Sequence, residues 1–214
     1  MHFTLFAILE AALLASSLSL DTLAAGFAYG ANNTKIPLLS ALIINMICSA
    51  TTGLSFVAGA IFKPYLPSGL TLALACTVLF LIGLTKLLDN ITKSIIRKHS
   101  NINKKLNGQF FNFTFVLEIY ANPETADIDA SKTISPGEAA LLALSLSLDG
   151  IAVGIGAAMA DVNGLAVFLW SLLTNLFFLL FGLFLGNKIA LKTSFNLSWL
   201  SGIVLIGLAI LKLF

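Results

Sequence analysis

The segment EAALLASSLSLD fills residues 10–21, and the segment EAALLALSLSLD fills residues 138–149. The two copies differ at a single position, where Ser16 aligns with Leu144. A match of this length indicates that the chain consists of two copies of one unit. The fold therefore depends on whether this unit is a soluble or a membrane-embedded structure.

The amino-acid composition shows what kind of unit is repeated. Hydrophobic residues make up 58% of the 214 residues, charged residues only 10%, and the mean hydropathy is +0.97. Soluble domains carry about 25% charged residues, so this composition excludes a soluble globular protein or a large enzyme domain outside a membrane. The net charge of +2 is too small for a nucleic-acid-binding surface, and the sequence has no Walker A motif for ATP binding. The unit is therefore expected to lie in a membrane, and the chain is not expected to be an enzyme.

Six apolar stretches are long enough to cross a bilayer, since a membrane-spanning helix needs about 20 residues. They occupy residues 3–29, 36–62, 69–88, 136–160, 165–186 and 194–214. The expected fold class is an all-α integral membrane protein with six transmembrane helices. Residues 1–88 would form the first three-helix repeat, residues 89–135 a cytoplasmic loop, and residues 136–214 the second three-helix repeat.

The two repeats are expected to be inverted relative to each other. Each contains an odd number of spans, so the second repeat enters the membrane from the opposite face. A further motif, Leu-Ile-Gly-Leu, occurs at residues 81–84 in the third span and at residues 205–208 in the sixth. Inverted repeats are typical of secondary transporters, whose site lies near the membrane midplane between the repeats. A duplication with a purely structural role is the alternative.

The basic residues predict the orientation of the chain. Ten of the twelve Lys and Arg residues fall on the side of the 89–135 loop, including Lys86 at the end of the third span. The other two, Lys63 and Lys212, fall on the opposite side. Because cytoplasmic loops carry the excess of Lys and Arg, we expect this loop in the cytoplasm and both termini outside the cell membrane.

Two aspartates form the core of a candidate site. Asp21 and Asp149 end the two copies of the repeated segment and reach a similar depth from opposite directions. A carboxylate at mid-membrane costs about 2.5–3.5 kcal/mol on insertion scales, so each needs a partner or an aqueous pathway. Neither span carries a nearby Lys or Arg, and two facing carboxylates alone would repel each other. A shared divalent cation would remove this repulsion; proton binding without a metal, or a buried structural role, is the alternative.

Other oxygen-bearing side chains could complete this metal site. Mn²⁺, Mg²⁺ and Ca²⁺ all prefer oxygen ligands. Ser17 and Ser145 each lie four residues before an aspartate, on the same face of the helix. Asn45 and Asn175 are polar residues at mid-depth in the second and fifth spans. The two asparagines could bind the ion, or they could form hydrogen bonds between helices.

The predicted cytoplasmic loop contains a second candidate ion site. Residues 127–138 space their oxygen-bearing side chains as a Ca²⁺-binding EF-hand loop does. Position 6 of that pattern is usually Gly and is Lys132 here. The alternative is a solvated acidic linker in which Glu138 begins the fourth helix. The candidate ligands are Asp127, Asp129, Ser131, Thr133 and Glu138.

The first part of the same loop is expected to contact lipid. Basic and apolar residues are mixed over residues 89–107, and such a segment beside a membrane usually lies on anionic headgroups. The predicted partners are therefore the lipid bilayer and a divalent cation. The cation is expected as a substrate, and no permanently bound cofactor is expected.

The residues around the two aspartates resemble a known family. Ser19-Leu20-Asp21-Thr22-Leu23-Ala24-Ala25-Gly26 and Ser147-Leu148-Asp149-Gly150-Ile151-Ala152-Val153-Gly154 resemble the paired Ser-x-Asp signatures of the MntP manganese efflux pumps. The resemblance covers essentially the whole chain, and the long central loop is similar to that of the sporulation branch of this family. It implies six membrane helices and divalent-metal export, with Asp21 and Asp149 taking the roles of the family's intramembrane aspartates.

The chain departs from the family pattern in the second span. The MntP pumps carry a glutamate there, whereas residues 45–49 read Asn-Met-Ile-Cys-Ser. Two functions are therefore compared. The first is a secondary transporter that exports a divalent cation such as manganese. The second is a non-transporting sporulation scaffold or sensor that retains the transporter fold.

Overall fold

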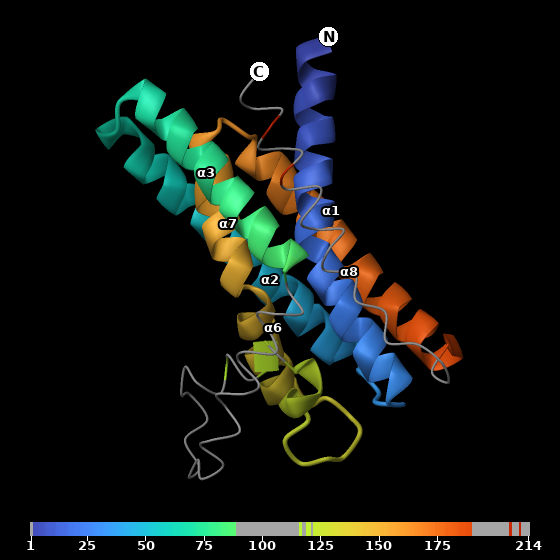
Figure 1. Ribbon diagram of the computed structural model, residues 1–214. Coiled ribbons are helices and arrows are strands. Elements are labelled where there is room, and N and C mark those ends of the chain that lie inside the picture. Colours follow the sequence, from blue (N-terminus) through green and yellow to red (C-terminus); the bar gives the residue numbers. More distant parts are fainter. Residues whose placement is uncertain are drawn as a thin grey trace.

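The computed structural model describes residues 2–88 and 122–189, together with residues 116, 119, 120, 206 and 210 (Figure 1). These residues are almost entirely helical, and among them a single isolated β-bridge pairs Lys35 with Thr133. The all-α prediction is thus confirmed for the described part of the chain. The helices are α1 (His2–Ala31), α2 (Leu38–Phe62), α3 (Ser68–Leu87), α6 (Pro136–Leu146), α7 (Leu148–Met159) and α8 (Gly164–Ile189), with the short 3₁₀ helices η1 (Lys63–Tyr65) and η2 (Pro123–Ala126).

Several of these helices are suited to crossing a membrane. Helices α1, α2 and α8 are long and apolar enough by themselves, and α6 with α7 gives a fourth span if the pair, bent by 46°, counts as one. Helix α3 contains a shorter apolar helix over Ala73–Leu87. The chain is therefore a multi-pass membrane protein. The predicted lipid-binding segment, 89–107, and most of the predicted sixth span, 194–214, lie outside the described residues.

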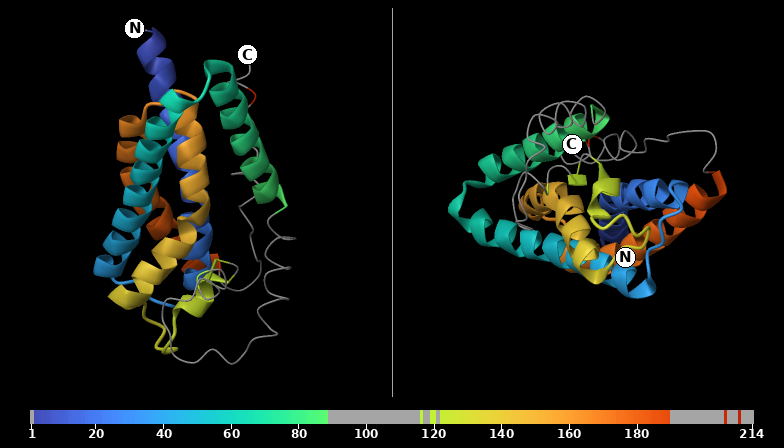
Figure 2. Two further views of the ribbon diagram at one scale, coloured as in Figure 1. Left: turned by 90° about the vertical axis from the view of Figure 1, so that its left-hand side faces the viewer. Right: turned by 90° about the horizontal axis from the view of Figure 1, so that it is seen from below.

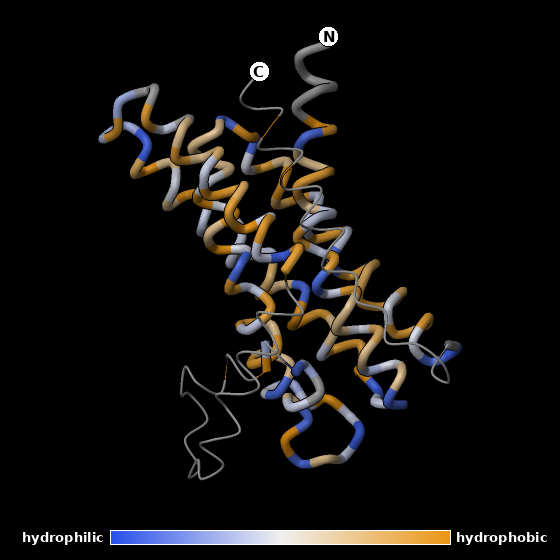
Figure 3. The backbone as a smooth tube through the Cα atoms, viewed as in Figure 1, coloured by the Kyte–Doolittle hydropathy of each residue, from blue (hydrophilic) through white to orange (hydrophobic). Residues whose placement is uncertain are grey.

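Polarity is distributed as a bilayer requires. Figure 3 shows hydrophobic residues along the lengths of the helices and hydrophilic ones concentrated in the connections. Large apolar side chains face outward, among them Leu54 of α2 and Leu173 of α8, which are 70% and 67% exposed. In water such surfaces would be costly, whereas in a bilayer they contact lipid tails.

The helices that carry the two copies of the repeated segment, α1 and α6–α7, begin at opposite ends of the bundle and run in opposite directions (Figures 1 and 2). At one end, the connection after α1 pairs with the segment before α6. The Lys35 amide donates to the Lys132 carbonyl (2.8 Å), and the Ile134 amide donates to the Lys35 carbonyl (2.9 Å). At the other end, an ion pair between Lys63 and Asp161 joins the connection after α2 to the connection after α7.

Helix α1 packs mainly on α8, and four glycines bring the two backbones into contact. A Cβ atom added at any of them would lie 2.3–2.5 Å from a carbonyl oxygen of the other helix. Only glycine permits such an approach, and small residues at four-residue spacing commonly support it in membranes. The four are Gly26 and Gly30 in α1 and Gly182 and Gly186 in α8.

A second pair of helices, α7 and α2, packs in a related way. Helix α7 packs on α2, as α1 packs on α8. A Cβ added at Gly154 would lie 2.7 Å from the Cβ of Ser55, and one added at Gly59 would lie 2.7 Å from the Cβ of Ala158. Both helix pairs therefore meet through small residues four positions apart.

Helix α3 lies at the edge of the bundle, outside the two closely packed helix pairs. Its main helix contact within the described residues is with α7, and Figure 2 shows it at the edge of the bundle. The last turn of α3 carries Lys86, whose side chain is 3% exposed. A peripheral helix thus directs its one charged side chain into the protein.

Candidate functional site

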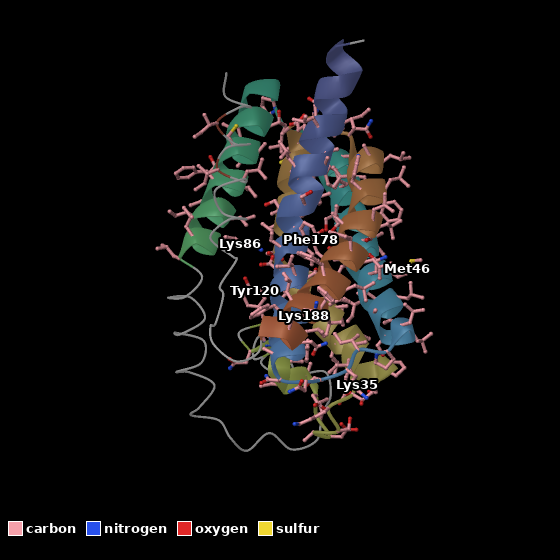
Figure 4. All side chains as sticks on the ribbon, turned by 90° about the vertical axis from the view of Figure 1, so that its right-hand side faces the viewer. Lys35, Met46, Lys86, Tyr120, Phe178 and Lys188 are labelled. Carbon is pink, nitrogen blue, oxygen red and sulfur yellow. The ribbon has the colours of Figure 1, made fainter. Side chains whose placement is uncertain are left out.

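Asp21 and Asp149 lie at one place in the bundle, where the side chain of Lys86 contacts both. The Lys86 ammonium forms ion pairs with Oδ2 of Asp21 on α1 and with Oδ2 of Asp149 on α7. The aspartate side chains are 11% and 12% exposed. Figure 4 shows Lys86 between the C-terminal end of α3 and α1. Three helices thus contribute one charged group each to a buried cluster, which we call the Asp–Lys–Asp site.

The two spans that carry the aspartates contain no Lys or Arg, but the structure brings Lys86 to them from α3. Because Lys86 stands at the end of an apolar span, its position in the sequence predicts a place among the basic residues of the cytoplasmic side. Its side chain is instead 3% exposed, and its ammonium contacts the carboxylates. One positive charge now faces two negative charges, so the described cluster carries a net charge of −1 with all three groups ionised.

The two aspartates are held differently. Lys86 contacts Oδ2 of both aspartates, and each aspartate lies in a different helical setting. Asp149 stands in the first turn of α7 and accepts the Gly150 amide at Oδ1 (2.8 Å). The positive end of a helix dipole stabilises an anion there. Half-helix ends of this kind commonly form the ion sites of transporters.

A break in the helix creates this N-terminus. Between α6 and α7 the chain bends at Ser147, whose hydroxyl donates to the carbonyl four residues earlier (2.6 Å). Such back-bonding bends helices. The aligned Ser19 makes the same contact (2.8 Å) within the continuous helix α1. The repeats differ at the next turn, where Gly150 replaces Thr22, and glycine is the weaker helix former.

A second polar cluster joins α1, α2 and α8. The Thr22 hydroxyl donates to Oδ1 of Asn175 (3.3 Å), and Nδ2 of Asn175 donates to Ser49 (3.5 Å). One turn earlier, the hydroxyls of Ser19 and Thr174 lie 2.8 Å apart. Asn175 therefore links three helices through hydrogen bonds. Of the two roles predicted for Asn175, hydrogen bonding between helices is therefore the one that the structure shows.

The remaining predicted ligands are buried within helices. The Ser145 hydroxyl donates to the Leu142 carbonyl (2.7 Å), and Ser17 is 1% exposed. Asn45 is 5% exposed, and among the described residues its Oδ1 has no hydrogen-bond partner. Buried acceptors without a partner are rare in folded proteins. Asn45 thus has a buried side-chain oxygen that could still bind an ion.

The predicted loop site brings three carboxylates together. One oxygen from each of Asp127, Asp129 and Glu138 lies within 4.8 Å of the others. Several of these carboxylate oxygens already accept hydrogen bonds from backbone amides. Asp127 accepts the amides of Ser131 and Lys132 (both 3.1 Å), and Asp129 accepts the amide of Ser131 (2.9 Å). Hydrogen bonding from the side chain of Ser131, and then from its backbone amide, holds the pKa of Asp129 below its usual range.

Glu138 closes the loop onto α6. Its Oε1 accepts the Ile128 amide (2.8 Å), and its Oε2 accepts the amide and hydroxyl of Ser135 (2.9 and 2.8 Å). Together with the Ser135 side chain it forms a capping box at the start of α6. Lys132 adopts a left-handed conformation with φ of 59°, at the position where an EF-hand loop has glycine. The contacts order this loop through its own backbone and side chains.

Replacing Glu138 with glutamine is expected to expose the loop to trypsin at Lys132. The amide retains one acceptor, but its NH₂ group faces donors, and losing a hydrogen bond to a charged group costs about 1.5–3 kcal/mol. Cleavage from the opened loop should be at least tenfold faster, since about 1.4 kcal/mol corresponds to a factor of ten. Asp161→Asn, at the opposite end of the bundle, is the control. Unchanged cleavage in Glu138→Gln would contradict this role of Glu138.

The same assay tests ion binding by the loop, which stays a prediction. Protection of the wild-type loop by millimolar Ca²⁺ or Mn²⁺, lost in Glu138→Gln, would support it. Cleavage that is indifferent to both ions would reject it, and the loop would then be held by its internal hydrogen bonds alone.

Comparisons with known proteins agree with these observations. The family described as "Putative manganese efflux pump" matches residues 111–213. The "Probable sporulation protein YtaF" of Bacillus subtilis (strain 168) is 30% identical over 204 residues, which cover 94% of this chain and 97% of that protein. No solved structure matches the chain.

Proposed function

The chain belongs to the MntP family, and from this premise we propose that it is a secondary transporter that exports a divalent metal cation, manganese first among them. The observation that carries the proposal is the meeting of Asp21 and Asp149, one from each repeated segment, inside the membrane-spanning part of the chain. Two carboxylates provide the charge and the hard oxygen ligands that Mn²⁺ prefers.

The proposed architecture is a pair of inverted three-helix repeats, with residues 194–214 as the sixth helix. The opposite directions of α1 and α6–α7, and the matching contacts of α1 with α8 and of α7 with α2, support it. Transport would then proceed by alternating access, in which one repeat rocks against the other around the shared site. The Asp–Lys–Asp site could change shape in two ways: α7 could move relative to α6 at the bend at Ser147, and α3 could move at the edge of the bundle.

The proposed orientation places both termini outside the cytoplasm. The connection that contains Lys35 and the 127–138 loop would lie on the cytoplasmic side, and the Lys63–Asp161 ion pair on the outer side. The excess of Lys and Arg near residues 89–135 supports this choice. Manganese would therefore enter the site from the side that carries the acidic loop.

Proteoliposomes test the proposed function directly. Vesicles that contain the purified chain and a trapped metal indicator should take up Mn²⁺ faster than protein-free vesicles, and the uptake should saturate. Comparison with Mg²⁺, Ca²⁺ and Zn²⁺ would define the selectivity. Absence of flux for all four ions would contradict the proposal.

A scaffold or sensor is the second candidate function. Two observations favour it: the second span has no carboxylate at residues 45–49, and Lys86 neutralises part of the charge of the aspartates without any metal. This function predicts a stoichiometric protein partner in membrane extracts and no metal flux. The flux experiment therefore separates the two candidates.

A further inference from the structure

The Asp–Lys–Asp site contains its own cation. The ammonium of Lys86 contacts Oδ2 of both aspartates and therefore stands where an ion shared by them would have to bind. A divalent ion and the ammonium cannot occupy the same place. With both cations present, the site as a whole, the two carboxylates included, would carry a net charge of +1 in a poorly solvated region, where an unbalanced charge is expensive.

We propose that Lys86 is a tethered competitor of the transported ion: its ammonium fills the site in the empty carrier and leaves when the divalent cation binds. This inference rests on the proposed function and adds a residue that controls affinity and net transport. Displacing one ammonium by one divalent cation changes the charge of the site from −1 to zero, so the exchange itself balances the two carboxylates.

The position of α3 suits a side chain that must move. Helix α3 packs mainly on α7 and lies at the edge of the bundle. The contact of Lys86 with Asp21 therefore spans from α3 to α1, and a shift of α3 relative to α1 would withdraw the ammonium from that aspartate. Aligning the two Leu-Ile-Gly-Leu motifs places Ile210 opposite Lys86, so the second repeat supplies no equivalent lysine. Among the described residues, Lys86 is the cation that contacts both aspartates.

Insertion of Lys86 should speed the return of the empty carrier in the transport cycle. A carrier whose empty site holds two uncompensated carboxylates would change conformation slowly, because the charge must cross an apolar region. With Lys86 inserted, part of this charge is neutralised, and the empty carrier can return to the conformation that accepts the next ion. Net efflux needs this return step, whereas exchange of Mn²⁺ across the membrane uses only the ion-loaded carrier. Lys86 should therefore matter for net flux and not for exchange.

Two variants with opposite expected effects test the proposal in the full-length chain. Lys86→Gln removes the competitor and should tighten Mn²⁺ binding by about 10–100-fold, since a binding-competent state populated at 1–10% weakens apparent affinity by that factor. Lys86→Arg keeps the charge and adds a planar fork that holds carboxylates more firmly, so it should weaken Mn²⁺ binding. In proteoliposomes, Lys86→Gln should retain Mn²⁺–Mn²⁺ exchange while net flux falls at least tenfold.

The outcomes separate this inference from the proposed function. If Lys86 only holds the fold together, both variants should bind Mn²⁺ less well or unchanged, and exchange and net flux should fall together; this result would overturn the inference while transport by the wild type stands. If Lys86→Gln does not yield folded protein, unchanged or tighter binding in Lys86→Arg would overturn the inference. A wild-type chain that neither binds nor transports any divalent cation would overturn both proposals.

Discussion

Replacing Asp149 with asparagine is expected to abolish Mn²⁺ transport, and replacing Asp21 is expected to do the same. Each change removes one of the two charges that would hold the ion. Losing one partner of a buried charge pair costs about 2–5 kcal/mol of binding free energy, which lowers the affinity by about 30-fold or more. Lys86 remains paired with the other aspartate in each single variant, so the cluster becomes neutral and the chain should still fold. Flux into proteoliposomes measures the effect.

The single variants are more informative than the double variant. Replacing both aspartates would leave the buried ammonium of Lys86 without a described ion-pair partner, and loss of flux could then reflect misfolding. Asp161→Asn is the matched control, because Asp161 pairs with Lys63 and is 81% exposed. It should keep wild-type flux. Flux near the wild-type rate in Asp21→Asn and Asp149→Asn would show that transport, if present, takes another route.

The second large effect concerns the contact between α1 and α8. Replacing Gly182 with leucine should destabilise the bundle strongly, because even a Cβ at this position would lie 2.4 Å from the Leu23 carbonyl oxygen. Overpacking of a tight contact costs about 1–3 kcal/mol and occasionally more. A loss of about 3 kcal/mol lowers a melting temperature by roughly 6–12 °C for a chain of this size.

Gly137 offers the matched control for this substitution. A Cβ added there meets no atom within 4 Å, and the residue is exposed at the start of α6. Gly137→Leu should therefore retain the wild-type melting temperature. Heating in detergent followed by size-exclusion chromatography compares the two variants. Equal stability of both would contradict the close approach of α1 and α8.

The sequence predicts the helices well and the site in part. Spans such as 36–62 follow from length and apolar composition alone, and the structure has a helix over Leu38–Phe62. The repeated segment also points to Asp21 and Asp149, which the structure brings together. These features depend on local pattern, which a single sequence contains.

Lys86 could not be predicted in the same way. A lysine at the end of an apolar span is normally attributed to the adjoining loop, and its contact with α1 and α7 depends on how three helices pack. The bend between α6 and α7 could not be predicted either. Ser19 and Ser147 make the same hydrogen bond to the carbonyl four residues earlier, but the helix bends only at Ser147. The signal that could have suggested Lys86 is the charge balance: two buried aspartates require a cation, and one basic residue stands at the end of an otherwise uncharged span.

The central claim is that one ion site is shared by the two repeats. Titration of the purified chain with Mn²⁺, followed by the electron paramagnetic resonance signal of the free ion, tests it most directly. The wild type should bind one more Mn²⁺ per chain than Asp21→Asn or Asp149→Asn, because the ion at the Asp–Lys–Asp site is lost in each variant, whether or not the 127–138 loop also binds Mn²⁺. The same number of bound Mn²⁺ ions, with the same affinities, in the wild type and in either variant would contradict a site made from both aspartates.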